Sequence, residues 1–187
     1  MDKAASSPAE YSLAAKVFHW VTASIFLIQF PIGIIMVQLG SGSTADFLKS
    51  SHLGIGFLIL WISLLRLFYR LRTEVPRRRS HLADWHFRAT RITHTTLYAL
   101  LILVPLTGWM GSSAANTLSL FGAITLPSIL APDSVRAIWL LWTHGLAAFG
   151  LIILVAFHVG FALQGYLEPS DDTEEASAPP LAAVASR

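Results

Sequence analysis

The sequence predicts an all-α integral membrane protein, a four-helix bundle with both termini in the cytoplasm. Of its 187 residues, 54% are hydrophobic and only 13% are charged, whereas soluble domains have about 25% charged residues. The hydrophobic residues are gathered in four stretches, each long enough to cross a hydrocarbon core about 30 Å thick. The excess of positive charge lies in one loop, and its position sets the predicted orientation.

The first half of the chain contains two predicted spans, residues 17–39 and 47–69. The first span is too long for a signal peptide and no small-residue cleavage site follows it. Pro31 and the glycine two residues later predict a kink inside this span. A turn rich in glycine and serine, residues 40–46, leads to the second span, and a short polar segment, residues 1–11, precedes the membrane domain.

The loop between the second and third spans carries the strongest charge signal in the chain. Residues 66–91 contain eight arginines and only two acidic residues, so the positive-inside rule places this loop in the cytoplasm. Because two spans precede the loop, the N-terminus is predicted to be cytoplasmic as well. Asp84 is a predicted cap for the helix that enters the membrane after this loop.

The second half of the chain contains the third span, residues 92–112, and the fourth, residues 135–166. Pro105, close to a glycine, predicts a kink in the third span. Residues 116–133 are apolar but interrupted by glycine and proline, so we expect them to lie on the periplasmic membrane surface. The membrane domain thus covers residues 12–167, and the acidic, proline-rich tail after it is expected to be disordered to residue 187.

The composition excludes several classes of site. The chain has no cysteine, which rules out disulfides, thiolate metal sites, cysteine-held iron–sulfur clusters and the covalent attachment of c-type haem. A net charge of +2 gives no indication of nucleic-acid binding. A cofactor would therefore be held by histidine, carboxylate or packing.

Two histidines of the fourth span, His144 and His158, are the first candidate functional residues. They are separated by fourteen positions in a run without charge, residues 137–167. Fourteen residues of α-helix return to within about 40° of the starting direction and rise about 21 Å. One helix face therefore presents an imidazole near each side of the bilayer, and ionisable residues inside membrane helices are candidate functional residues.

The predicted topology gives these two histidines partners at the same depth. His52 shares the periplasmic level with His144, and His19 and His94 share the cytoplasmic level with His158. Facing helices of a bundle often hold cofactors, and histidine is a common axial ligand of haem. We therefore predict two b-type haems, each held by two histidines, although spacing does not choose between His19 and His94. Zinc or copper is the alternative, but no Asp, Glu, Cys or second nearby His completes either site.

Other residues near the histidines have secondary interpretations. Three arginines of the cytoplasmic side are candidates for contacts with haem propionates: Arg66, Arg70 and Arg91. Glycines beside the histidines would either admit a flat ring or form close helix contacts: Gly54, Gly56, Gly145, Gly150 and Gly160. His81 and His86 are expected to face solvent or lipid headgroups.

Several motifs together resemble the bacterial cytochrome b561 family, which shares a domain with the cytochrome b subunits of nickel–iron hydrogenases and formate dehydrogenases. The resemblance covers residues 10–167. The motifs are V-F-H-W at 17–20, H-L-G-I-G at 52–56, R-L-F-Y-R at 66–70, His94 followed by P-L-T-G at 105–108, L-F-G at 120–122 with L-P at 126–127, and the histidine pair of the last span.

The resemblance implies a set of ligands that spacing does not fix. His52 and His144 would hold a periplasmic haem b, and His19 and His158 a cytoplasmic one. His94 would then lie near the cytoplasmic haem, in a quinone pocket or next to a haem ligand. No catalytic residue beyond the haem ligands is implied.

The closest resemblance is to the stand-alone family members that take electrons from superoxide and reduce ubiquinone. In those proteins a further histidine, associated with quinone, follows the last haem ligand. This chain has none there, which leaves Gln164 or Tyr166 for that contact. Superoxide is an anion, and Lys49 and Arg136 precede the periplasmic histidines, although acidic residues close by cancel their charge.

The predicted function is therefore an oxidoreductase of the bacterial inner membrane that oxidises superoxide and reduces ubiquinone. One alternative is a cytochrome b subunit that links a periplasmic redox partner, hydrogenase-like or a small cytochrome, to the quinone pool. A further alternative, of a different class, is a haem-free structural or transport protein with four spans.

Overall fold

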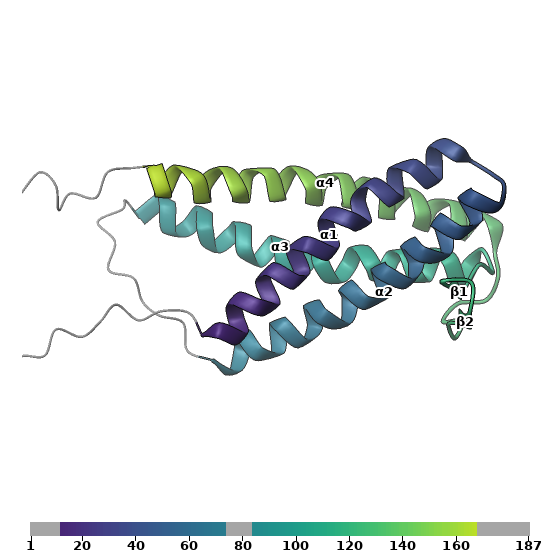
Figure 1. Ribbon diagram of the computed structural model, residues 1–187, viewed down its shortest axis with the longest axis horizontal. Helices are drawn as coiled ribbons and strands as arrows, with labels where there is room; N and C mark the ends of the chain where they lie inside the picture. The colour runs from purple at the N-terminus through teal and green to yellow at the C-terminus, as the bar shows by residue number, and fades with distance from the viewer. Residues whose placement is uncertain (1–11, 74–83, 168–187) are drawn as a thin grey trace, which may run out of the picture.

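A computed structural model describes residues 12–73 and 84–167 of the chain (Figure 1). Four helices long and apolar enough to cross a membrane make up most of this part. They are α1 (Leu13–Leu39), α2 (Ser43–Arg72), α3 (Asp84–Ala114) and α4 (Ser134–Leu167). The predicted all-α bundle with four spans is confirmed, and the chain is a multi-pass membrane protein.

The helix ends follow local sequence signals. Helix α1 begins after Ser12, whose Oγ accepts a hydrogen bond from the backbone N–H of Ala15 at 3.2 Å. The turn before α2 is shorter than predicted and consists of residues 40–42 alone. Gly40 and Gly42 have φ angles of 67° and 108°, which glycine adopts without steric cost, so the chain reverses at once.

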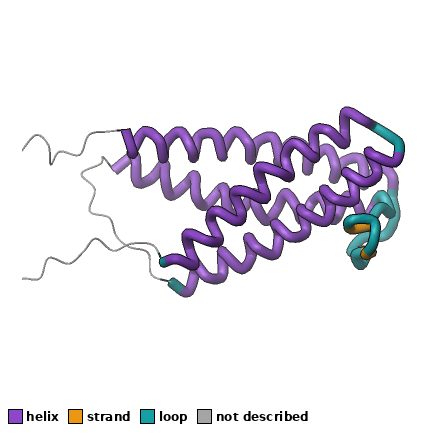
Figure 2. The backbone as a smooth tube through the Cα atoms, viewed as in Figure 1, coloured by secondary structure: helices purple, strands orange, loops and turns teal. Residues whose placement is uncertain are grey.

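The two prolines predicted to kink the first and third spans lie inside α1 and α3. Figure 2 shows each of the four helices as one uninterrupted element. Interruption of a helix by proline costs less in a membrane bundle because neighbouring groups can satisfy the freed carbonyl. Residues 1–11 and 168–187, together with His81, lie outside the described residues. His86 lies in α3, but the structure does not describe its side chain.

The helices are arranged as a chain of neighbours, α1 beside α2, α2 beside α3 and α3 beside α4 (Figure 1). Among the described residues, no Cα pair within 8 Å joins α4 to α1 or to α2. At the level of the backbone, α4 therefore packs against α3 and meets α1 and α2 only through side chains. We call the end where α1 begins and α4 finishes the terminal end, and the opposite end the hairpin end.

The hairpin end is covered by a small β-hairpin between α3 and α4. Strands β1 (Ser119–Leu120) and β2 (Ile124–Thr125) pair antiparallel. The hairpin joins α2 through a hydrogen bond from Phe121 N–H to the Ser50 carbonyl at 3.1 Å. Its buried leucines pack against partly buried residues of α2 and α3; the group comprises Leu118, Leu120, Leu126, Leu53, Phe57 and Trp109. The segment expected to lie on the membrane surface is thus folded onto the bundle.

Candidate functional site

Five histidines gather at two levels of the bundle, and each level includes one histidine of α4. At the hairpin end, the ring centroids of His52 on α2 and His144 on α4 are 6.0 Å apart. At the terminal end, the ring of His158 on α4 lies 6.2 Å from that of His19 on α1. It lies 5.1 Å from the ring of His94 on α3. The structure therefore brings together the two groups of histidines that the sequence places at equal depth.

The ring spacings test whether a metal ion fits between two imidazoles. With metal–nitrogen bonds of about 2.1 Å and imidazole radii of about 1.1 Å, two imidazoles on opposite sides of one ion have centroids about 6.4 Å apart. The spacings of the His52–His144 and His19–His158 pairs agree with this value, and the His94–His158 spacing is shorter.

The donor set distinguishes haem from an ion held by protein alone. In the described part of the chain, no group of three or more His, Cys, Asp or Glu is placed to hold a metal ion. Haem iron needs only two axial ligands from the protein, because the porphyrin supplies the others. Two facing histidines on different helices therefore fit haem better than zinc or copper.

A hydrogen bond to a neighbouring helix fixes the His144 ring. Its Nδ1 lies 2.8 Å from the carbonyl oxygen of Val104 on α3. A carbonyl can only accept, so Nδ1 carries the hydrogen and Nε2 keeps a free lone pair for a metal. The ring lies against Gly108, where an added Cβ would be 3.0 Å from Nδ1 and from Cε1.

The His52 ring packs against Gly33 of α1, as the His144 ring packs against Gly108 of α3. A Cβ added at Gly33 would be 2.9 Å from His52 Cε1. Gln29, one helical turn before Gly33, donates a hydrogen bond from Nε2 to the His52 carbonyl at 2.8 Å. Glycines of the opposite helices therefore leave room for both rings at the hairpin end.

Sequence reasoning did not connect Gly33 and Gly108 with the histidine rings, and considered the glycines beside the histidines instead. Gly54 faces the Phe121 ring and Gly56 faces Gln29, while a Cβ at Gly145, Gly150 or Gly160 would meet no described atom within 4 Å. Gly33 and Gly108 were expected only to help kink their helices. Matching glycines to histidines by depth, as was done for the histidines themselves, would have found them.

The terminal end is organised around Arg66 of α2. Its Nη2 lies 3.1 Å from His19 Nδ1, and its guanidinium lies 5.3 Å from the centroid of the Tyr98 ring. Arginine can only donate, so His19 Nδ1 accepts this hydrogen bond. His94, by contrast, donates from Nδ1 to the Thr90 carbonyl at 2.8 Å, which leaves its Nε2 unprotonated. Ring spacing thus favours His19 as the partner of His158, whereas the hydrogen bonds favour His94.

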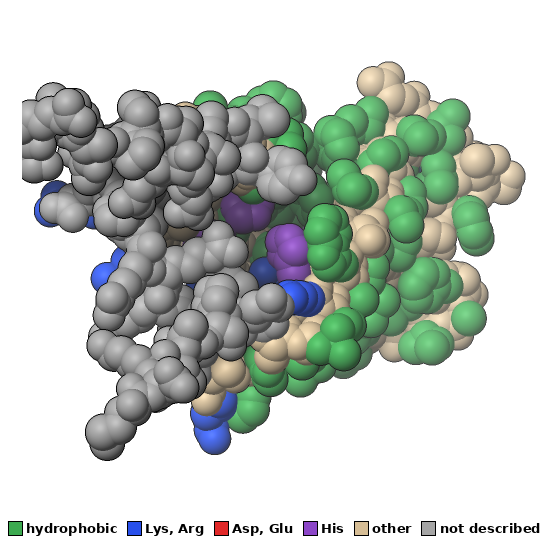
Figure 3. Space-filling view, turned by 60° about the vertical axis from the view of Figure 1, so that its left-hand side comes forward, with side chains coloured by type: hydrophobic (Ala, Val, Ile, Leu, Met, Phe, Trp, Pro, Cys, Tyr) green, Lys and Arg blue, Asp and Glu red, His purple; other side chains and the backbone are tan. Residues whose placement is uncertain are grey.

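The two ends of the bundle differ in charge. Figure 3 turns the terminal end toward the viewer and shows histidine side chains next to those of Lys or Arg. Arg66 is half-buried there, while Arg70 and Arg91 are exposed. The cations of this end whose side chains the structure describes are Lys16, Arg66, Arg70, Arg72, Arg88 and Arg91.

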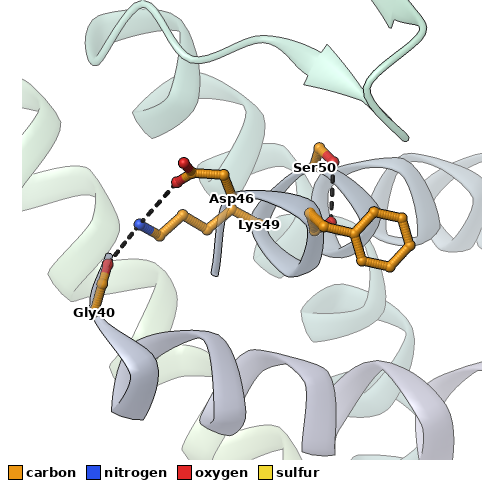
Figure 4. A network of polar contacts seen from close by, with 5 residues as sticks. Gly40, Asp46, Lys49 and Ser50 are labelled. Carbon is orange, nitrogen blue, oxygen red and sulfur yellow. Dashed lines mark hydrogen bonds and ion pairs between the residues drawn. The ribbon is translucent and has the colours of Figure 1, made fainter. Parts of the chain in front are cut away.

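At the hairpin end each cation is paired. Lys49 lies 3.7 Å from Asp46 and donates to the Gly40 carbonyl at 2.7 Å (Figure 4). Arg136 lies 3.5 Å from Asp133, whose pKa is lowered mainly by a hydrogen bond from the Arg136 backbone N–H. The local charge is therefore balanced beside the His52–His144 pair.

Comparison with known proteins identifies the family. The family model described as Prokaryotic cytochrome b561 matches residues 10–168. Cytochrome b561 homolog 2 of Escherichia coli (strain K12) is 28% identical over 171 residues, which cover 90% of each chain. The facing histidines, the four spans and this match lead to one conclusion: the chain belongs to the prokaryotic cytochrome b561 family, and is a membrane b-type cytochrome that transfers electrons.

Proposed function

We propose that the protein binds two haems b, oxidises superoxide at the hairpin end and reduces ubiquinone at the terminal end. The observation that carries this proposal is the presence of two histidine pairs at metal-spanning distance, one toward each end of the bundle. The concentration of cations at the terminal end supports placing that end in the cytoplasm of a bacterial inner membrane.

We assign His52 and His144 to the haem of the hairpin end, and His19 and His158 to that of the terminal end. The choice of His19 rests on ring spacing, because 6.2 Å admits an iron ion and the 5.1 Å spacing to His94 is short for one. Ligation through His19 Nε2 moves the ring proton to Nδ1, so Arg66 then needs another acceptor. A propionate is a suitable one, which makes Arg66 the best placed of the three candidate arginines.

The overall reaction balances in electrons and protons. When bound, the two haems supply reversible one-electron transfer through the thickness of the bundle. Two superoxide anions each lose one electron and leave as dioxygen, while one ubiquinone takes up two electrons and two protons. His94 is exposed beside His158, and Tyr98 lies under Arg66, so both are candidates to hydrogen-bond the quinone. Gln164 near the end of α4 is a third candidate.

A second candidate function is electron exchange with a periplasmic protein partner. Three large apolar side chains of the hairpin segment are exposed outside the membrane spans: Phe121, Ile124 and Ile129. An apolar surface of this kind is typical of a docking site. The paired charges around Lys49 and Arg136 also provide little electrostatic attraction for superoxide.

Anaerobic stopped-flow spectroscopy of the purified protein tests the proposal. A b-type α-band is expected on reduction, and superoxide should produce it at a rate approaching about 10⁸ M⁻¹s⁻¹. The absence of any α-band would overturn the haem assignment. Slow reduction by superoxide, with both haems present, would overturn only the choice of donor and favour the protein partner.

A further inference from the structure

Two buried polar atoms of the hairpin-end site have no hydrogen-bond partner within the described residues. They are Nδ1 of His52 and Oε1 of Gln29. Buried polar atoms are usually hydrogen-bonded, so an unsatisfied donor and acceptor in neighbouring side chains call for a physical explanation. The two residues already touch, because Gln29 Nε2 donates to the His52 carbonyl at 2.8 Å.

The amide of Gln29 lies beside the backbone of α2 at His52. A Cβ added at Gly56, one turn after His52 on α2, would be 3.2 Å from Gln29 Nε2. A Cβ added at Gly33 on α1 would be 2.9 Å from His52 Cε1, 3.4 Å from Nδ1 and 3.9 Å from Nε2. The ring therefore turns its Cε1 toward Gly33, and Nδ1 is the nitrogen closer to that position of α1, the helix that carries Gln29.

His144 shows how the equivalent hydrogen bond is made on the other side of the site. Its ring lies against Gly108, and its Nδ1 donates to the carbonyl of Val104, four residues before that glycine. The His52 ring lies against Gly33, and Gln29 stands four residues before that glycine. The corresponding acceptor on α1 is thus a side-chain amide oxygen in place of a backbone carbonyl.

We propose that Gln29 is the positioning residue of His52, and that its Oε1 accepts the Nδ1–H of His52 when Nε2 is bound to haem iron. This inference rests on the proposed haem function. Iron ligation through Nε2 leaves the hydrogen on Nδ1, and a buried N–H in that position requires an acceptor. The hydrogen bond raises the basicity of the imidazole, stabilises ferric iron and so lowers the potential of this haem.

Redox titration of the haem-loaded protein tests the proposal. Gln29→Met keeps the length of the side chain and removes both hydrogen bonds, so the hairpin-end potential should rise. We expect about a tenfold change in the redox equilibrium constant, which is about 59 mV for one electron. The terminal-end potential should stay constant. The matched control is Gln38→Met, which makes the same change at an exposed position of the same helix and should leave both potentials constant.

Gln29→Glu separates the acceptor role from the existing donation to the His52 carbonyl. A carboxylate keeps the acceptor and loses the donor, so this variant should not raise the hairpin-end potential. A rise of equal size in both Gln29 variants would assign the effect to the lost backbone contact and overturn the proposal. Unchanged potentials in Gln29→Met, with both haems bound, would also overturn it. Failure of the wild-type protein to bind haem would instead contradict the proposed function itself.

Discussion

The hairpin-end and terminal-end histidines use the same side chain in two different settings. At the hairpin end, His52 and His144 each lie against a glycine of a neighbouring helix. The His144 ring is hydrogen-bonded to Val104 of α3, and Gln29 of α1 is hydrogen-bonded to the His52 backbone. At the terminal end, three imidazoles share one region with Arg66, and His94 is exposed. The described histidines are thus more enclosed at the hairpin end than at the terminal end.

This difference fits the two tasks proposed for the ends. A haem that only takes and passes on electrons would benefit from fixed ligands, because a small reorganisation energy speeds electron transfer. A site that reduces quinone also has to bind a second molecule and supply protons. His94 and Tyr98, which lie beside the terminal-end histidines and Arg66, are the side chains we propose for that purpose.

Helix α4 contributes one histidine to each pair, and replacing either of them should have the largest effect on haem content. His144→Ala should remove the hairpin-end haem and leave roughly half of the wild-type haem per protein, because each iron depends on two axial ligands. His158→Ala should remove the other half. Haem content measured against protein, together with the α-band that remains, checks both variants. Loss of all haem in either variant would show that the two sites do not fill independently.

Two variants at the terminal end test whether His19 or His94 holds the haem together with His158. His19→Ala should lose the terminal-end haem, whereas His94→Ala should keep both haems, because its spacing to His158 is only 5.1 Å. His94 Nε2 is free to take up a proton and pass it to the quinone, so His94→Ala should still slow quinone reduction, by about 10²-fold. Haem content and the rate of quinol formation separate the two variants. Haem loss in His94→Ala with full haem in His19→Ala would reverse the ligand assignment.

The glycines against the rings test how tightly the hairpin-end site is built. Gly108→Ala should disturb His144, because an added Cβ would be 3.0 Å from its ring. The cost of such overpacking, about 1–3 kcal/mol, exceeds the gain of about 0.5–1 kcal/mol from replacing a helical glycine. We expect a shifted hairpin-end α-band and a lower thermal midpoint. Gly145→Ala is the control, since its Cβ would meet no described atom within 4 Å.

The features predicted correctly from the sequence depend on hydropathy and charge averaged over many residues. Hydropathy over about twenty residues fixes the number and order of the spans, because every backbone group inside a membrane must be bonded within a helix. Charge in one loop then assigns depth along each span. Depth was sufficient to group His52 with His144 and to group His19 and His94 with His158.

The features that the sequence did not predict depend on how each helix is rotated about its axis and on which side chains of neighbouring helices touch. The depth of a residue in the membrane does not tell which residue of α1 faces a given residue of α2. The contacts of Gln29 and Gly33 with His52 could therefore not be predicted from the sequence. The contact between Arg66 and His19 joins two helices in the same way. The β-hairpin was missed because strands of two residues each are too short to show an alternating pattern.

Variants at the contact between the β-hairpin and α2 should have the smallest effect, on the rate at which small reductants reach the hairpin-end site. Phe121 has a φ of 50°, unusual for a bulky residue, and a Cβ added at Gly54 would be 2.5 Å from its ring. Gly54 lies two residues after His52 on α2, so Gly54→Ala should move Phe121 away from α2 close to the hairpin-end site. Small water-soluble reductants should then reduce the hairpin-end haem faster, by a few-fold. Stopped-flow reduction at several reductant concentrations measures the change.

Phe121→Ala provides the matching test, because it removes the same contact from the other side. Both single variants should speed reduction of the hairpin-end haem alike, and the double variant should add nothing, since changes that act on one contact are not additive. Additive rates would mean that Gly54 and Phe121 limit access separately. In that case the hairpin would not act as a cover over the hairpin-end site, and the two ends of the bundle would differ only in how their histidines are held.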